Sequence, residues 1–204
     1  ISDKGIVAGN KQSKEDRLQG YFATEVQKYL AAKGRKIIGW DELLECNVDQ
    51  SATIMSWRGA EPGAQAAALG HDVIMTPNSH AYFDYYQTAN NHNEPLLIGG
   101  DLPIEKTYSF EPIPEGTPAE AGKHILGVQA NLWSEYIVSE SLAEYQVLPR
   151  MGALSEVQWM EPAQKDFKNF VKRVECLRAI YELKGYTYAK HLWPEEHLKG
   201  SREL

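Results

Sequence analysis

The chain has 204 residues, of which 43% are hydrophobic and 24% are charged, and its formal net charge at pH 7 is -7. This composition is ordinary for a globular protein, and the acidic balance argues against a groove for nucleic acid. No apolar run approaches the length of a membrane-spanning helix. The sequence therefore predicts neither a nucleic-acid partner nor a membrane partner, and its length fits one domain or a large part of one.

The two cysteines, Cys46 and Cys176, lie far apart in the sequence and lack the spacing of metal ligands. We therefore expect no metal site, no cofactor and no disulfide framework. The chain begins at Ile1 with neither an initiator methionine nor a signal peptide. We expect it to be a piece of a longer protein.

Hydrophobic periodicity predicts alternating helices and strands after an irregular, polar lead over 1–13. The expected elements are a helix over 14–33, strands over 36–40 and 53–57, a helix over 61–69, strands over 72–76 and 125–130, and helices over 139–145, 148–159 and 165–181. Gly34 and Gly70 are placed to end the first two helices. An insertion over 77–122 is rich in Pro, Asn and Gly, and such long insertions are usually functional or mobile.

Strands that alternate with helices indicate a parallel sheet with crossover helices. Four strands are half of an eight-stranded barrel. We therefore predict an α/β fold, namely the C-terminal half (about strands 5–8) of a TIM (β/α)8 barrel. This half barrel would comprise residues 14–184, and 185–204 would form a tail without assigned structure.

Three tryptophans close or follow three of the predicted strands: Trp40, Trp57 and Trp133. A single tryptophan at a strand end is more often part of the core. Three at equivalent ends of parallel strands would converge on one cavity, where such barrels keep their active sites. An indole-lined cavity suits a small apolar group such as an acetamido methyl.

Two pairs of residues with i, i+2 spacing follow the third and fourth strands. If the backbone stays extended, Trp133 and Glu135 point the same way. An aromatic plate beside a carboxylate suits a sugar ring, which has an apolar face and a rim of hydroxyls. Tyr82 and Asp84 repeat this arrangement and could bind a polarised carbonyl and a hydroxyl, or could instead tether the long loop.

The adjacent carboxylates Asp41 and Glu42 could be the acid–base pair of a glycosidase. Neighbouring side chains on an extended strand face opposite sides, so both cannot reach one bond without a bend. We predict structural roles instead, in which Asp41 binds backbone groups at the barrel top and Glu42 caps the segment that follows. His80 and His124 lack a nearby nucleophile, and we expect them to be hydrogen-bonded scaffold residues.

Four motifs occur in order along the chain: Gly39-Trp40-Asp41-Glu42, Met55-Ser56-Trp57-Arg58-Gly59, Ala81-Tyr82-Phe83-Asp84 and the segment from Gly127 to Glu135 that reads GVQANLWSE. In order and spacing they resemble the second half of glycoside hydrolase family 20, the β-N-acetylhexosaminidases built on a (β/α)8 barrel. The resemblance covers about residues 14–180. It implies an exo-acting enzyme that hydrolyses terminal N-acetyl-hexosamine by substrate-assisted, retaining catalysis, an exception to the two-carboxylate scheme.

The resemblance also implies roles for residues. Tyr82 would hydrogen-bond the acetamido carbonyl oxygen that attacks the anomeric carbon, and Asp84 and Glu135 would hold sugar hydroxyls O6 and O4. The wall of the N-acetyl pocket would be formed by three indoles, those of Trp40, Trp57 and Trp133. The parent protein would be secreted, periplasmic or lysosomal.

One departure from the family decides what we expect of the chain itself. The family's His-x-Gly-Gly-Asp-Glu motif, which supplies the acetamide-orienting Asp and the acid Glu, is absent from these residues, as is a sugar-binding Arg. We expect the chain alone to be inactive, to need the N-terminal half of the barrel as its partner, and to self-associate through exposed strand edges. The alternatives are a non-catalytic carbohydrate-binding half-barrel and a different barrel glycosidase that uses Asp41 or Glu42.

Overall fold

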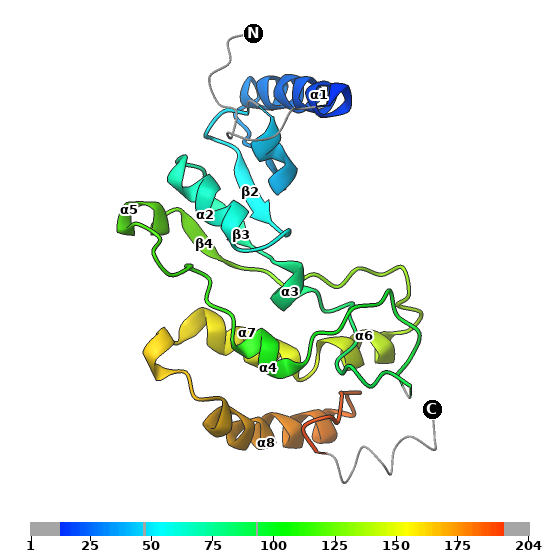
Figure 1. Cartoon of the computed structure of the whole chain (residues 1–204). Coiled ribbons are helices and arrows are strands. Elements are labelled where there is room, and N and C mark those ends of the chain that lie inside the picture. Colours follow the sequence, from blue (N-terminus) through cyan, green and yellow to red (C-terminus); the bar gives the residue numbers. More distant parts are fainter. Residues whose placement is uncertain (1–12, 47, 93, 194–204) are drawn as a thin grey trace. The chain divides into compact units, whose positions relative to one another are not determined.

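The structure is a computed structural model that describes residues 13–46, 48–92 and 94–193 (Figure 1). The chain forms two compact units, one of residues 1–77 and 112–129 and the other of residues 78–111 and 130–204. Nearly all of the predicted lead, 1–12, and the end of the predicted tail, 194–204, lie outside the described residues.

A four-stranded parallel sheet is the main feature of the first unit. Its strands are β1 (Ile38–Trp40), β2 (Thr53–Ser56), β3 (Val73–Met75) and β4 (Ile125–Val128), and they lie in the order β1-β2-β3-β4. All three pairings are parallel, with Trp40 opposite Met55 and Ser56 opposite Met75. The parallel sense and the sequential order confirm the prediction and are the arrangement of consecutive strands in a (β/α)8 barrel.

The helices of the first unit are α1 (Lys14–Ala31), α2 (Glu61–Ala68) and α5 (Ala119–Gly122), with a 3-10 helix, η1 (Asp41–Glu45), directly after β1. Helix α2 packs on β2 and β3 (Figure 1). A Cβ atom added at Gly63 would lie 2.6 Å from Met75 Sδ, so a side chain here would require Met75 to move. The predicted bounds of α1 and α2 are correct to within two residues, and Gly34 and Gly70 follow them with φ of +67° and +86°.

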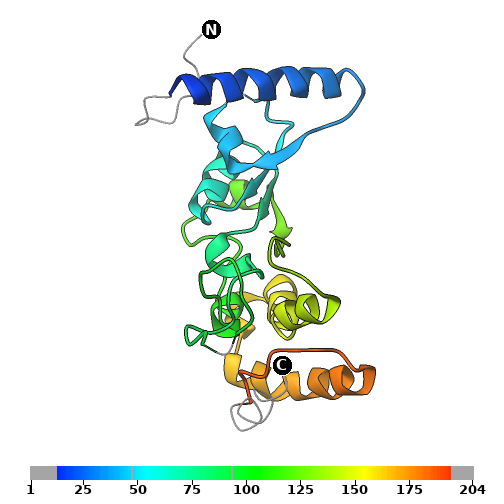
Figure 2. The same cartoon turned by 90° about the vertical axis from the view of Figure 1, so that its right-hand side faces the viewer.

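Helix α1, in dark blue in Figure 2, keeps its predicted apolar face but does not bury it. A capping box starts the helix, because Ser13 Oγ accepts from Asp16 N–H at 3.1 Å and Asp16 Oδ2 accepts from Ser13 N–H at 2.8 Å. Leu18 and Phe22 are each 69% exposed, and Tyr29 is 65% exposed. An exposed apolar stripe of this kind is typical of a surface that another protein segment covers.

The second unit is helical. Its elements are α3 (Asn78–Ala81), α4 (Ile104–Tyr108), α6 (Glu140–Val147), α7 (Arg150–Trp159), the 3-10 helix η2 (Pro162–Gln164) and α8 (Phe167–Lys184). Helices α4 and α7 lie side by side, and the Tyr108 ring stacks on Phe170 of α8 at 4.8 Å between centroids. The three long helices confirm the prediction, whereas the insertion 77–122 contains the short helices α3, α4 and α5 that its Pro- and Gly-rich sequence did not indicate.

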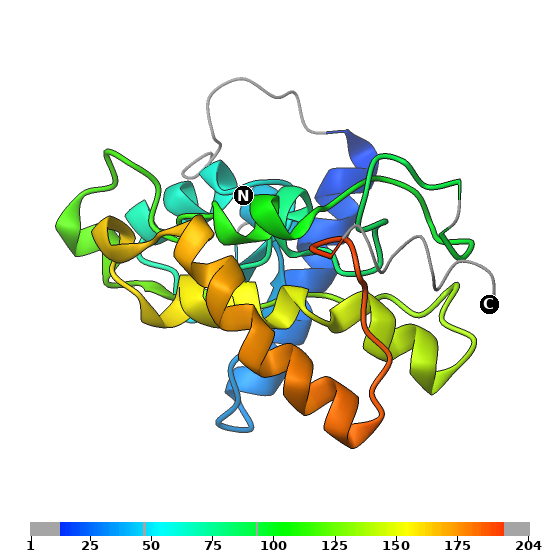
Figure 3. The same ribbon diagram turned by 90° about the horizontal axis from the view of Figure 1, so that it is seen from below.

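The described part of the tail, 185–193, turns back along α8, as Figures 2 and 3 show in red. Gly185, with φ of +72°, ends the helix. Tyr188 is buried, and its ring centroid lies 5.5 Å from that of Tyr181. The Arg178 guanidinium lies 5.1 Å from the centre of the Trp193 ring. No structure was predicted for this segment from the sequence, and its aromatic side chains pack against α8.

Candidate functional site

The C-terminal ends of β1 and β2 are tied together by Asp41, which is fully buried. Its Oδ2 accepts from the main-chain N–H groups of Trp57 and Arg58, both at 3.0 Å, and its Oδ1 accepts from Arg58 Nε at 2.5 Å. A buried carboxylate with three donors is well satisfied. The predicted structural role of Asp41 is therefore confirmed.

Glu42 holds the indole of Trp57. Both Glu42 carboxylate oxygens lie 3.1 Å from Trp57 Nε1, which donates to them. The 3-10 helix η1 has no side-chain cap, so the prediction that Glu42 caps this segment is wrong. Glu42 binds the Trp57 indole N–H and does not cap the main chain of η1. A partly buried indole N–H needs a hydrogen-bond acceptor.

In the second unit, the segments that follow β3 and β4 lie side by side. Tyr82 and Asn131 form a parallel bridge, and Phe83 N–H donates to Asn131 O at 2.7 Å. This pairing sets the ring centroid of Tyr82 6.4 Å from that of Trp133, and 5.6 Å from that of Tyr85. The structure thus brings together two of the predicted site residues, Tyr82 and Trp133, which are distant in the sequence.

The Tyr82 hydroxyl hydrogen-bonds with neighbouring side chains. Burial raises the pKa of Tyr82, while hydrogen bonds with the side chains of Trp133 and Asn131 oppose that rise. An indole N–H can only donate, so the Tyr82 oxygen is the acceptor in its pair with Trp133 and its own proton is not used there. At neutral pH the group is a protonated phenol, which can donate to a carbonyl oxygen.

Asp84 is buried, and among the described residues no hydrogen-bond partner reaches its Oδ1. Burial raises the pKa of Asp84 to about 6, and the carboxylate of Glu135 adds to this rise, whereas a hydrogen bond from the main-chain N–H of Asp84 itself and the Arg150 guanidinium oppose it. Asp84 and Glu135 are therefore close enough to interact electrostatically. Glu135 itself is exposed, and Trp133 is 40% exposed. A buried carboxylate oxygen without a donor is suited to accept from a ligand hydroxyl.

The predicted site residues are divided between the two units. Trp40 and Trp57 belong to the first unit, and Tyr82, Asp84, Trp133 and Glu135 belong to the second. That all three indoles wall one cavity stays a prediction.

The histidines near the strand ends are hydrogen-bonded scaffold residues, as predicted. His80 Nδ1 lies 2.8 Å from Ser79 Oγ, and burial lowers the pKa of its imidazole. His124 Nδ1 lies 3.2 Å from Asp72 Oδ1.

Sequence reasoning missed Arg150, which is fully buried at the start of α7. An arginine in the first turn of a helix normally lies in solvent. The sequence signal that could have indicated burial is its position directly before an otherwise apolar helical face, since Ala153, Leu154 and Val157 are all buried.

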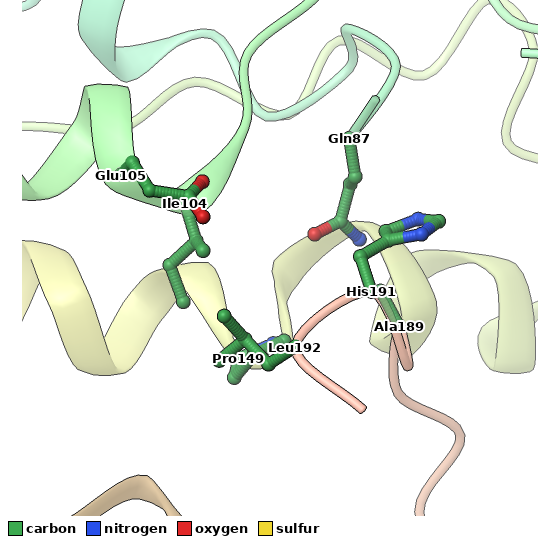
Figure 4. A pocket seen from close by; sticks show the side chains of 7 residues that line it. All are labelled: Gln87, Ile104, Glu105, Pro149, Ala189, His191 and Leu192. Atoms are coloured by element: carbon green, nitrogen blue, oxygen red, sulfur yellow. The ribbon is translucent and has the colours of Figure 1, made fainter. Parts of the chain in front are cut away.

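A pocket in the second unit has a different character (Figure 4). Its volume is about 30 Å³, room for about one or two water molecules, and it is lined by Gln87, Ile104, Glu105, Pro149, Ala189, His191 and Leu192. None of the predicted site residues lines it. His191 Nε2 lies 2.7 Å from the carboxylate of Glu94, which also accepts from Tyr145 Oη at 2.8 Å. These contacts fasten the tail, and the pocket is far smaller than a site for a sugar.

Residues 13–46, 48–92 and 94–193 contain neither a candidate metal site nor a candidate membrane span. The described ranges hold no group of three or more His, Cys, Asp or Glu that could bind a metal ion. Within the same ranges, no helix is both long enough and apolar enough to cross a membrane. Cys46 and Cys176 are both free thiols.

Comparison with known sequences identifies close relatives. The family described as glycosyl hydrolase family 20, catalytic domain, matches residues 4–162. A β-hexosaminidase of Porphyromonas gingivalis is 42% identical over 191 residues, which are 93% of this chain and 24% of that protein. A β-hexosaminidase of Vibrio furnissii is 31% identical over 156 residues, which are 74% of this chain and 25% of that protein. The chain spans about a quarter of the length of these curated relatives.

Comparison with solved structures gives the same result. The exo-β-N-acetylglucosaminidase of Vibrio harveyi, solved in complex with N-acetylglucosamine, matches with a TM-score of 0.78 and 32% identity. The match covers 91% of this chain and 29% of that chain. The fold of this chain is therefore that of part of such a catalytic domain.

Proposed function

The chain belongs to glycosyl hydrolase family 20, and from this premise we propose that it forms the C-terminal half of the catalytic barrel of an exo-acting β-N-acetylhexosaminidase. In this proposal residues 14–184 make up the half barrel. The substrates are glycosides that end in N-acetyl-hexosamine, and the partner is the N-terminal half of the same barrel.

The observation that carries the proposal is the pairing of Tyr82 with Trp133. The Tyr82 ring centroid lies 6.4 Å from that of Trp133, and a phenol O–H can donate to an acceptor on the substrate. In the proposed reaction that acceptor is the acetamido carbonyl oxygen of the substrate. This oxygen attacks the anomeric carbon, and a donor fixed beside it both orients it and stabilises the charge that develops in the oxazolinium ion.

Asp84 and Glu135, both in the second unit, are proposed to recognise the hydroxyl groups of the sugar. Asp84 presents a buried oxygen for which the described residues offer no donor, and Glu135 adds an exposed carboxylate near it. We assign the binding of sugar hydroxyls O6 and O4 to these two groups. An acceptor-only carboxylate pairs well with hydroxyl donors.

The pocket for the acetamido methyl is assigned to three indoles, those of Trp40, Trp57 and Trp133. Glu42 supports this role in the first unit, since its carboxylate fixes the orientation of the Trp57 ring. The Asp-Glu pair that orients the acetamide and protonates the leaving oxygen is assigned to the N-terminal half, because its motif is absent from these 204 residues.

The proposal is tested with the full-length protein that carries this chain. We expect it to hydrolyse p-nitrophenyl N-acetyl-β-glucosaminide and to leave p-nitrophenyl β-glucoside intact, because the glucoside lacks the acetamide that acts as nucleophile. Cleavage of both substrates at similar rates would contradict substrate assistance.

A Glu42→Gln variant in the same assay separates this proposal from a different barrel glycosidase. The amide oxygen of glutamine can still accept from Trp57 Nε1, so the loss is about 1 kcal/mol and turnover stays within roughly fivefold of wild type. Abolished turnover with unchanged thermal unfolding would instead identify Glu42 as an acid or base.

Asp84 gives a pH-dependent prediction. Its pKa of about 6 lies above the ordinary value, so the ionised form that accepts from sugar hydroxyls is lost as the pH falls below that value. We expect the affinity of the full-length protein for N-acetylglucosamine to fall by roughly tenfold between about pH 7 and pH 5, as protonation competes with binding. Calorimetric titration measures this. In an Asp84→Asn variant the affinity for N-acetylglucosamine should no longer fall with pH. An identical pH dependence in the variant and the wild type would contradict the assignment of this effect to Asp84.

A further inference from the structure

Arg150 is a buried cation held by carbonyl groups. It is fully buried, and its donors make five hydrogen bonds to main-chain oxygens: Nε to Gln146 at 3.0 Å, Nη1 to Tyr85 at 3.2 Å and Leu102 at 3.1 Å, and Nη2 to Phe83 and Gln146, both at 2.6 Å. Burial lowers the pKa of this guanidinium to about 9, so it stays charged at neutral pH. A buried charge without a directly bonded carboxylate is costly, which calls for an explanation of its presence.

The acceptors of Arg150 flank Asp84 in the sequence. Phe83 and Tyr85 are the residues immediately before and after Asp84, and one guanidinium binds the carbonyl groups of both. The same cation also lies 4.8 Å from the centre of the Phe83 ring. A planar guanidinium has a rigid fork of donors, so it fixes the direction of the carbonyl groups of the two residues that flank Asp84.

Gln146 reinforces this clamp from one turn earlier in the chain. Its Nε2 lies 3.4 Å from Asp84 O and 3.5 Å from Tyr85 O. Three consecutive carbonyls, those of residues 83 to 85, are therefore held from the α6–α7 junction. The middle residue of the three is Asp84, and its carboxylate Oδ1 has no donor among the described residues.

Arg150 also interacts with the charge of Asp84. The guanidinium opposes the rise in the pKa of Asp84, a rise caused by burial and by Glu135. The other ionisable groups that interact with Arg150 are Glu94 and Tyr145. Arg150 thus favours the ionised form of Asp84, and its hydrogen bonds to the carbonyls of Phe83 and Tyr85 hold the main chain on both sides of that residue.

We propose that Arg150 is a positioning residue of the sugar site, which clamps the peptide groups around Asp84 and so fixes its carboxylate for a substrate hydroxyl. This inference rests on the proposed function. Arg150 touches no substrate in this assignment and acts through Asp84.

The test is a double-mutant cycle in the full-length protein, with Arg150→Lys and Asp84→Asn made singly and together. Lysine keeps the charge but loses the fork of donors. We expect Arg150→Lys to lower kcat/KM for p-nitrophenyl N-acetyl-β-glucosaminide by about 10- to 100-fold, as small misplacements do. In the Asp84→Asn background, Arg150→Lys should lower kcat/KM only a few-fold, because the Asp84 carboxylate through which Arg150 acts is already absent.

The matched control is Arg173→Lys on α8, where the guanidinium pairs with Glu156 at the surface and does not contact residues 83–85. It should leave kcat/KM unchanged. Equal losses from Arg150→Lys in both backgrounds would overturn the proposal, since a purely structural role is indifferent to Asp84. Rates are expressed per folded enzyme, counted by active-site titration, so that lower stability alone does not imitate the effect.

If Arg150→Lys does not fold, Gln146→Met replaces it in the cycle. This change removes the two bonds to the carbonyls of Asp84 and Tyr85 and the 3.5 Å bond that Gln146 Oε1 accepts from Arg150 Nη2, and it leaves the bonds of Arg150 to main-chain carbonyls in place. The wild-type rate in the same assay tests the proposed function separately. If the wild-type protein were inactive, the cycle would be read from calorimetric affinities for N-acetylglucosamine. Non-additive affinities would support the clamp even then, and additive ones would overturn it.

Discussion

The 204-residue chain, purified alone, is expected to release no p-nitrophenol from p-nitrophenyl N-acetyl-β-glucosaminide above the buffer rate. The sequence contains no His-x-Gly-Gly-Asp-Glu motif, and in the function proposed above the acetamide-orienting Asp and the acid Glu are assigned to the N-terminal half. General acid catalysis alone contributes about 10²- to 10⁴-fold. Loss of the acid together with half of the pocket leaves too little rate enhancement to detect. Measurable turnover by the pure chain would contradict this expectation.

Activity should return when the chain is combined with the missing half of the barrel. Mixing the chain with the N-terminal half of the barrel should restore hydrolysis, because the interface between the halves rebuilds the parallel sheet and the exposed apolar face of α1 becomes covered. The matched control is an N-terminal half in which the Asp-Glu pair is replaced by Asn and Gln, and this mixture should stay inactive. If the two halves associate in sedimentation but hydrolyse nothing, the hexosaminidase assignment fails in favour of a sugar-binding half-barrel.

The second large effect concerns Tyr82. In the full-length protein, Tyr82→Phe should lower kcat for p-nitrophenyl N-acetyl-β-glucosaminide by about 10²- to 10³-fold, the usual effect of removing a preorganised donor from a developing charge. KM should change much less, because the ring that packs on Trp133 and Tyr85 is retained. Steady-state kinetics at saturating substrate separate the two parameters.

Tyr108→Phe is the matched control for this change. Tyr108 is also buried, and its hydroxyl donates to Glu156 at 3.1 Å in the helical core of the second unit. Loss of either hydroxyl costs roughly 1 kcal/mol of stability. The two variants should therefore unfold at similar temperatures while only Tyr82→Phe loses activity. Comparable kcat values for Tyr82→Phe and wild type would exclude the proposed contact with the acetamide.

The positions of the elements could be predicted from the sequence because the signals that set them are local. The alternation of apolar periods located all four strands, and Gly34 and Gly70 marked helix ends through their left-handed conformations. The motifs at the strand ends pointed to Tyr82 and Trp133, which the structure places 6.4 Å apart between ring centroids. Parallel strands in sequence order carry their C-terminal residues to the same edge, so this proximity follows from topology.

What only the tertiary structure decided was the partner of each polar side chain. Glu42 was predicted to cap its own segment, yet it binds an indole 15 residues away, and Arg150 binds a carbonyl 67 residues away. Hydrogen bonds between residues far apart in the sequence leave neither a periodic pattern nor a local composition that sequence analysis could detect. Any donor can bind any buried acceptor that packing brings within reach. The sequence by itself therefore determined the half-barrel architecture and the motifs at the strand ends. The burial of Arg150 depended on how α7 packs against the segments around residues 83–85 and 102.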